Sequence, residues 1–250
     1  MSQFTRRESL GMIGALTAYG LIEGLFSRDL FAGDVKPIVG AWLTDLNTLG
    51  QDLKNSKMKD VQFQVKMEEL YRKVDLADLV KHVRLDELAA KTKLPDNGAA
   101  NIGIDLAKIE GAPSKPVFGR QIFAMKKGRS VVPHGHDNMC TGFIILRGEF
   151  HGRHYDRLED HADHYIITST VDRTFKPGEV STISDHKDNV HWFEATSDTG
   201  FIFNVHVTGY DPKWPRPTGR VYVDPNGEKL SGGKVKAMKM TSRECHKKYG

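Results

Sequence analysis

The chain lacks the residues and patterns that define several common classes of protein. Only two of its 250 residues are cysteine, Cys140 and Cys245, so at most one disulfide could form and a disulfide scaffold is excluded. It has no glycine-rich phosphate loop and no Gly-x-Ser-x-Gly nucleophile motif. Although the net charge is +4, no basic stretch is interleaved with aromatic residues, so we expect no nucleic-acid partner.

Length and composition are those of an ordinary globular protein. Hydrophobic residues make up 39% of the chain and charged residues 27%, which is close to the average of soluble domains. A chain of 250 residues can bury one substantial core and still carry extensions. We therefore expect one principal domain.

The first residues resemble an export signal. Arg6 and Arg7, within residues 5–10, stand directly before an uncharged apolar run at 10–22. This arrangement resembles the twin-arginine signal of bacteria. The run is too short and too rich in glycine to be a stable membrane span. The resemblance predicts a signal segment at 1–32, a periplasmic protein, and the twin-arginine export machinery as a partner.

An amphipathic helix is the other interpretation of this segment, with Leu10, Ile13 and Leu16 on one face. The absence of charge from the apolar run, and its start directly after the arginines, favour the signal. Cleavage near Ala32 would place Leu30 at the third position before the cut, where small residues are typical. The start of the mature chain is therefore left open.

Residues 33–112 have the pattern of helices. Apolar residues recur there at intervals of three and four, at Trp42, Leu43, Leu46, Leu49 and Leu53, and again at Val65, Met67, Leu70, Val74 and Leu76. Pro95 and Gly98 then interrupt the pattern. No motif in this part carries chemistry. We expect a helical N-terminal cap that packs on a later domain.

From residue 117 the pattern changes to short strands. They are expected at 121–125, 142–150, 164–170, 179–183, 190–196, 201–207 and 220–223, with turn signals between them. Short strands at this spacing indicate a mainly β sandwich or barrel, which we place at 113–225. The lysine-rich residues 226–250 are expected to form a basic C-terminal tail, either as an edge hairpin or as a frayed end.

Histidines are concentrated in the β region and suggest a metal site. His134 and His136 are separated by one residue, so in a strand their side chains point to the same face. With His191 from a second strand they would supply three imidazole ligands for a divalent metal. Otherwise these residues are hydrogen-bonded histidines of a half-buried strand. Four more are expected on a solvated strand end and loop, with a surface metal as the alternative: His151, His154, His161 and His164.

The two strands at 190–196 and 201–207 could pair as a hairpin that closes on residues 198–199. Such a hairpin would set His191 opposite His206, and both would share a face with Asn204. On that basis Asn204 and His206 are candidate catalytic residues that orient the ligands or bound oxygen. The alternative for His206 is a buried histidine whose hydrogen bonds are satisfied.

The histidine region also resembles the metal motifs of the cupin barrels. Gly128, the His134 and His136 pair, and Gly148 follow the spacing of the first cupin motif, with Thr141 where most cupins have a glutamate. The resemblance is closest to the thiol dioxygenases that hold iron with three histidines, in the group of plant cysteine oxidases and cysteamine dioxygenases. Further matching residues are Met139, Leu146, Tyr155, Asp156, Asn189, Val190, Trp192, Phe193, Ala195, Asn204, Val205 and Tyr210.

The resemblance implies a cupin-type β-barrel (jelly roll) with Fe²⁺, or another divalent metal, at His134, His136 and His191. It implies a dioxygenase that acts on a small thiol and dioxygen, since three neutral ligands leave the metal its full charge and open positions. The chain departs from that group at Asn204, where the group has aspartate, and at 158–164, which have no counterpart. Two alternatives stay open: a cupin enzyme of other chemistry, such as a diketone dioxygenase or isomerase, and a non-catalytic metal- or ligand-binding cupin.

The export signal is tested by changing both arginines to lysine. A receptor reads the arginine pair itself, so Arg6→Lys combined with Arg7→Lys should leave the protein in the cytoplasm although hydrophobicity and charge are unchanged. Cell fractionation and immunoblotting measure the distribution. Periplasmic delivery of the double variant at the wild-type level would contradict the assignment.

Overall fold

The structure is a computed structural model that describes residues 38–250, all of which belong to one compact unit. The expected signal segment at 1–32 lies outside the described residues, so its assignment stays a prediction. In the part of the chain that is described, no helix has the length and apolar character needed to cross a membrane.

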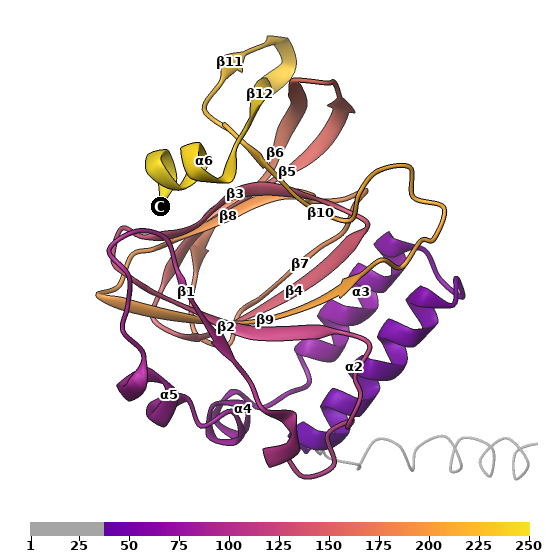
Figure 1. The fold of residues 1–250 in the computed structure, drawn as a ribbon, viewed down its shortest axis with the longest axis vertical. Helices are drawn as coiled ribbons and strands as arrows, with labels where there is room; N and C mark the ends of the chain where they lie inside the picture. The colour runs from indigo at the N-terminus through magenta and orange to yellow at the C-terminus, as the bar shows by residue number, and fades with distance from the viewer. Residues whose placement is uncertain (1–37) are drawn as a thin grey trace, which may run out of the picture. The chain divides into compact units, whose positions relative to one another are not determined.

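Two antiparallel sheets face each other in the barrel (Figure 1). In spatial order, the first consists of β1 (Ala100–Gly103), β2 (Gly119–Lys126), β9 (Thr199–Thr208), β4 (Met139–Arg147) and β7 (Val180–Ile183). The second consists of β10 (Gly219–Val223), β3 (Ser130–Asp137), β8 (Val190–Ala195), β5 (Phe150–Asp160), β6 (His164–Phe175), β12 (Lys234–Met240) and β11 (Glu228–Lys229). From β2 to β10, each connection between consecutive strands crosses from one sheet to the other, except the β5–β6 connection, which stays within the seven-stranded sheet. This is a jelly roll, so the predicted mainly β fold with a jelly-roll barrel is confirmed.

Helices cover the outer face of the five-stranded sheet, where α3 contacts β4 and β7 and α2 packs beside α3 (Figure 1). They are α2 (Val39–Lys54), α3 (Asp60–Tyr71), α4 (Leu76–His82) and α5 (Leu85–Lys91), followed by the 3₁₀ turn η2 (Leu106–Lys108). The predicted helical N-terminal extension is therefore present. Residues 100–103, which fall within the expected cap, instead form β1 and pair with β2 in the barrel.

The five-stranded sheet separates two hydrophobic cores. Because side chains alternate along a strand, β9 directs Phe203 and Val205 to the helices and Ile202 to the other sheet. On the helix side the ring of Trp42 lies 5.9 Å from that of Phe203, measured between centroids. Its indole Nε1 donates a hydrogen bond to the Leu70 carbonyl at 2.9 Å. The helical cap therefore completes the burial of the sheet's outer face.

The expected hairpin between β8 and β9 is wrong. β8 lies in the seven-stranded sheet and β9 in the five-stranded sheet, so the chain crosses the barrel between them. His191 is paired with His134 and His154, whereas His206 is paired with Gly119 and Thr141. In the β8–β9 connection, the Asp198 carbonyl accepts from the Lys127 amide of the β2–β3 turn at 3.0 Å, and the Thr196 amide donates to the Glu149 carbonyl at 2.9 Å. Both strands are buried on their two faces, which a two-stranded hairpin cannot provide.

Residues 226–250 contain the expected hairpin, β11–β12, but they do not end as a tail. β12 also pairs with β6 and β10, and the chain continues through the turn η3 (Ser231–Gly233) and the helix α6 (Ser242–Tyr249). Thr241 caps this helix, because its hydroxyl accepts a hydrogen bond from the Glu244 amide at 3.3 Å. Cys245 is buried against β3, where its thiol donates to the Pro133 carbonyl at 3.4 Å.

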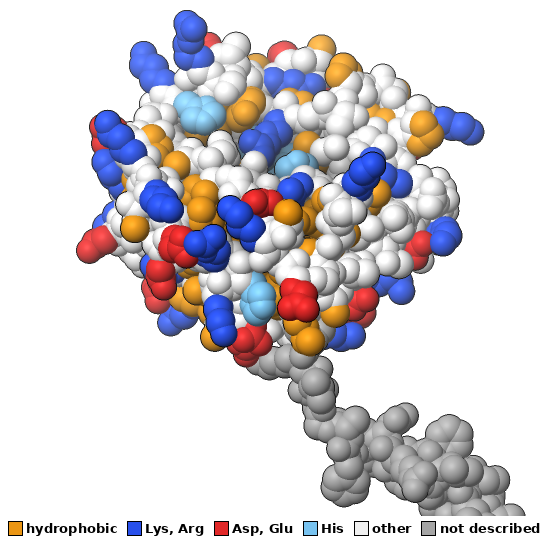
Figure 2. All heavy atoms as spheres, turned by 60° about the horizontal axis from the view of Figure 1, so that its bottom comes forward, with side chains coloured by type: hydrophobic (Ala, Val, Ile, Leu, Met, Phe, Trp, Pro, Cys, Tyr) orange, Lys and Arg blue, Asp and Glu red, His pale blue; other side chains and the backbone are white. Residues whose placement is uncertain are grey.

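The face shown in Figure 2 has mixed charge. Lysine and arginine side chains are interspersed with aspartate and glutamate, and hydrophobic side chains appear in small groups between them. Neither a broad patch of one sign nor a wide apolar surface is visible on this face, so it offers no evident docking site.

Close packing of α3 on the sheet depends on Gly142. A β-carbon at this position would lie 2.7 Å from the terminal methyl of Met67 and 2.9 Å from the Tyr71 ring. Gly142→Ala should therefore destabilise the fold by about 1–3 kcal/mol, the usual cost of overpacking. Gly103→Ala is the matched control, because nothing lies within 4 Å of its β-carbon position. Urea unfolding measures both, and equal stabilities would contradict the packing argument.

Candidate metal centre

Neighbouring strands bring three histidines to one point inside the barrel. β3 and β8 pair with His134 opposite His191, and His136 lies two residues farther along the same face of β3. One ring nitrogen from each lies within 4.8 Å of the others. Among the described residues this is the only group of three or more potential metal ligands with this geometry. The predicted ligand set is therefore assembled by strand pairing alone.

Hydrogen bonds fix the tautomers of two of these rings. The Nδ1 atom of His134 lies 2.7 Å from the Val132 carbonyl oxygen, and that of His191 lies 3.1 Å from the Asn189 carbonyl oxygen. A carbonyl can only accept, so each Nδ1 carries the proton and each Nε2 keeps its lone pair. This is the arrangement in which a histidine binds a metal through Nε2.

The centre has unsatisfied acceptors that a metal would satisfy. The Nε2 atoms of His136 and His191 are buried and have no hydrogen-bond partner. Buried polar atoms normally find partners, so two orphaned nitrogens on converging rings need an explanation. A divalent metal bound to the three rings supplies it, and the residues present fit such an ion.

The electrostatics keep these imidazoles neutral. Burial is the main cause that lowers the pKa of His134, His136 and His191 well below the usual range, and the positive charge of Arg220 lowers all three further. Metal ligation needs the neutral form, so the three ligands are ready to bind at neutral pH without first losing a proton.

Asn189 holds the ligand strand in place. Its Oδ1 accepts a hydrogen bond from the His136 amide at 3.2 Å, and its Nδ2 donates to the His136 carbonyl at 3.0 Å. Gly135 permits this approach, since a β-carbon there would lie 2.6 Å from the Asn189 oxygen. Sequence reasoning placed Asn189 beside a ligand but missed that its side chain clamps the backbone of another.

The five-stranded sheet closes the centre from the opposite side. Thr141, at the position of the cupin glutamate, brings its hydroxyl to 3.4 Å from Nδ1 of His136. Phe143 lies 5.5 Å from His191 between ring centroids. No described Asp or Glu joins the three histidines. The donor set is therefore three neutral nitrogens.

The structure brings Asn204 and His206 to the interior face of β9, across the barrel from the histidines. Asn204 is buried, with its Oδ1 accepting from Gln121 Nε2 at 3.3 Å and lying 3.4 Å from His206 Nδ1. His206 is half-buried over Gly119. Burial lowers the pKa of His206, and Arg220 lowers it further. No hydrogen bond joins either residue to the three histidines, so their catalytic roles stay predictions.

A cavity of about 50 Å³ opens beside His134. Its lining includes Phe123, Val131, His134, Arg220, Tyr222 and His246. Sequence reasoning missed Arg220 and Tyr222, because they reach the centre only through the pairing of β10 with β3, where Arg220 is opposite His136 and Tyr222 opposite His134. No local sequence pattern predicts a contact between strands that lie so far apart in the chain.

Of the four histidines expected on a solvated strand end, His151 pairs with the exposed Asp172, and the other three are of two kinds. His161 and His164 lie at the β5–β6 turn and stack with 4.4 Å between ring centroids. His154 is instead buried, with its Nε2 3.0 Å from the Ser181 hydroxyl. Burial lowers the pKa of His154 to about 4. The alternation along β5 explains this, because His154 shares the interior face with its cross-strand partner His191.

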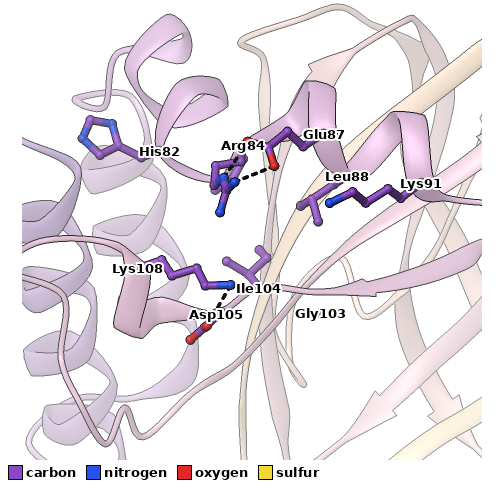
Figure 3. A pocket seen from close by; sticks show the side chains of 10 residues that line it. His82, Arg84, Glu87, Leu88, Lys91, Gly103, Ile104, Asp105 and Lys108 are labelled. Carbon is purple, nitrogen blue, oxygen red and sulfur yellow. Dashed lines mark hydrogen bonds and ion pairs between the residues drawn. The ribbon is translucent and has the colours of Figure 1, made fainter.

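A larger pocket of about 220 Å³, lined in part by His82, lies apart from the three-histidine centre, among α4, α5 and the residues that follow β1 (Figure 3). Most of its charges are already paired. Arg84 is bound to Glu87 at 2.5 Å, and Lys108 lies 3.5 Å from Asp105. It contains no cluster of potential metal ligands and lends no chemistry to the centre.

Comparisons with known proteins give only distant matches. No protein-family model matches the sequence, and neither does any curated protein. An oxalate oxidase structure is 18% identical over 53% of this chain and 60% of its own, with a TM-score of 0.36. A cupin superfamily protein from Desulfitobacterium hafniense is 14% identical over 48% and 87%, with a TM-score of 0.32. A double-stranded β-helix protein from Klebsiella pneumoniae is 9% identical over 53% and 85%, with a TM-score of 0.36. Likeness at this level carries no conclusion about activity.

Removal of a ligand tests the metal centre. His134→Ala, His136→Ala and His191→Ala should each abolish stoichiometric binding of a divalent metal, since two imidazoles alone hold it poorly. Asn189→Ala should weaken binding by about 10–100-fold, as expected for a group that positions a ligand. Metal analysis after dialysis gives the readout, and circular dichroism checks the fold.

His164→Ala is the matched control, because His164 lies outside the cluster and its ring contacts Asp163. It should bind metal as the wild type does. Full metal occupancy in any of the three ligand variants would show that the cluster is not a metal site.

Proposed function

We propose that this protein is a mononuclear non-haem iron dioxygenase that acts on a small thiol. The observation that carries the proposal is the donor set, three buried neutral imidazoles with no carboxylate, beside a small cavity. Fe²⁺ in such a set would supply positive charge, redox chemistry and open positions for a thiolate and dioxygen. The spacing of the histidine motifs supports the same group of enzymes.

The residues around the centre favour an anionic sulfur. Apart from neighbouring histidines, the charged side chains that lower the pKa of the three ligands are arginines, Arg220 for all of them and Arg157 for His136. A positive surrounding stabilises the thiolate relative to the thiol, so it lowers the pH at which the substrate can bind as an anion. The positive charge would therefore assist binding of the thiolate before the reaction with dioxygen begins.

The opposite sheet limits access of water and positions the reactants. Phe143 covers one side of His191, and the apolar core around Phe193 fills the barrel beyond it. Asn204 and His206 present an amide and an imidazole to the same interior. We assign to them the orientation of bound oxygen or of the substrate, a role that depends on geometry more than on binding energy.

The proposed location of the protein rests only on the pair Arg6 and Arg7 of the expected export signal. With the signal at 1–32, the enzyme would act on thiols of the periplasm. The metal centre and its chemistry do not depend on this assignment.

Oxygen uptake tests the proposed reaction. The Fe²⁺-loaded protein should consume oxygen only when a thiol is present. Asn204→Ala should lower kcat by about 10–100-fold with a smaller change in KM, because an orienting group acts mainly on the reacting geometry. An oxygen electrode and product analysis by mass spectrometry give both quantities, with His164→Ala as the unaffected control.

Three outcomes separate the alternatives. Uptake with a diketone and not with thiols would keep the oxygenase and discard the thiol. Tight binding of a small ligand without turnover of any substrate would establish a non-catalytic binding cupin. An unchanged kcat in the Asn204 variant would remove that residue from the mechanism.

A further inference from the structure

Two of the three ligand histidines are held by the pairing of β3 with β8, and the third is not. His134 and His191 lie directly opposite each other in that ladder. Within the described chain they form its last pair, so His136 has no partner residue on β8. The backbone amide and carbonyl of a buried residue normally find hydrogen-bond partners. Those of His136 therefore need partners from outside the β3–β8 ladder.

Side chains supply these partners. The side-chain amide of Asn189 binds both the backbone amide and the carbonyl of His136. The guanidinium of Arg157, from β5, is a second donor to that carbonyl, with Nη1 3.3 Å from the oxygen. A carbonyl oxygen has two lone pairs and can accept both bonds. Arg157 and Asn189 therefore hold the same backbone group of a ligand.

The same two side chains also reach the loop between β7 and β8. Nη2 of Arg157 lies 3.5 Å from the Asp185 carbonyl oxygen. Nδ2 of Asn189 donates to the Ser184 carbonyl at 3.2 Å. Each side chain thus connects the strand that carries one ligand to the loop that leads into the strand of another.

Neutralisation of nearby carboxylates does not account for Arg157. Asp137 accepts two bonds from Arg216, at 2.7 and 2.9 Å, both shorter than the 3.2 Å bond from Arg157. Asp160 lies 2.7 Å from Lys239 but 3.9 Å from Arg157. The Arg157 side chain is only 8% exposed, and burial of a charge is costly unless close partners compensate it. What Arg157 adds to this network is its contacts with backbone carbonyls.

We propose that Arg157 is a positioning residue of the metal centre. Together with Asn189 it acts in place of strand pairing, fixes the backbone of His136, and so sets how much this ligand contributes to metal binding. Groups that orient a ligand in this way normally affect metal affinity without touching the metal. The inference rests on the metal-binding part of the proposed function and not on its thiol or oxygen chemistry.

Metal affinity tests the inference, because positioning and charge predict opposite changes. Co²⁺ is the probe, since its visible absorption depends on the geometry of its ligands. Arg157→Met should weaken Co²⁺ binding about tenfold and alter this absorption, as expected when a group that supports a ligand is lost. Loss of a nearby positive charge alone would instead strengthen the binding of a cation. Titration followed by absorption spectroscopy measures both quantities.

The Arg157→Met variant should fold. Asp137 keeps its two bonds to Arg216, and the His136 carbonyl keeps its bond to Asn189. Urea unfolding of the metal-free protein measures the stability separately from metal binding. Arg157→Lys keeps the charge but not the planar pair of donors, so it should weaken Co²⁺ binding at least about threefold. This variant carries the test if Arg157→Met does not fold.

Arg153→Met is the matched control. Arg153 lies on the same strand, is partly buried, stacks on Trp192 with its guanidinium carbon 4.2 Å from the ring centroid, and pairs with Glu194 at 3.4 Å. Its replacement removes a similar cation–π contact and ion pair but no bond to the backbone of a ligand. Co²⁺ affinity and absorption should therefore equal those of the wild type.

A double-mutant cycle tests whether Arg157 and Asn189 hold the same group. In each single variant the other side chain still donates to the His136 carbonyl. The combination of Arg157→Met with Asn189→Ala should therefore weaken Co²⁺ binding by more than the product of the two single losses. Losses that simply multiply would overturn the inference, because they would show that the two side chains act independently.

The outcomes distinguish the inference from the proposed function. Unchanged or tighter Co²⁺ binding by both Arg157 variants, or an equal loss in Arg153→Met, would overturn the inference and leave the dioxygenase proposal intact. Arg157-dependent Co²⁺ binding in a protein whose Fe²⁺ form consumes no oxygen with any thiol would support the inference and end the dioxygenase proposal. A wild-type protein that binds no Co²⁺ and no Fe²⁺ would end both.

Discussion

The pairing of β3 with β8 is the constraint on which the metal centre depends. The register sets His134 opposite His191, and the alternation of side chains brings His136 to the same face. A shift by one residue would turn His134 and His136 away from the interior together. Asn189 hydrogen-bonds to both the amide and the carbonyl of His136 and so ties this register to the loop before β8. The ligands are positioned by backbone pairing and need no flexible loop.

The two faces of the five-stranded sheet have different tasks. Its outer face is covered by α2 and α3, and Gly142 allows α3 to approach closely. Its inner face is apolar in the middle of the barrel and polar near the histidines, where Thr141, Asn204 and His206 lie. The helical cap therefore has a structural role, since it supports the sheet that forms one wall of the centre. The apolar interior keeps the imidazoles neutral by excluding water.

Charge sets the chemistry that the centre can favour. Three neutral donors would not compensate the charge of a divalent metal, and the arginines that lower the pKa of these histidines, Arg220 and for His136 also Arg157, are cationic. Thr141 stands where a carboxylate ligand would remove part of that charge. Ligands that bring negative charge, such as thiolates and carboxylates, are accordingly stabilised on two counts.

The sequence by itself determined the type of each long segment and the candidate ligands. The spacing of Trp42, Leu43 and Leu46 predicts helix, and one intervening residue puts His134 and His136 on one face, because both are properties of neighbouring residues. The tertiary structure decided the rest. It placed β8 and β9 in opposite sheets, so His206 faces the ligands across the barrel, and it brought Arg220 beside His136 through β10. Such contacts join strands far apart in the chain, and the free energy that selects them comes from burying both faces of every central strand, which no local pattern records.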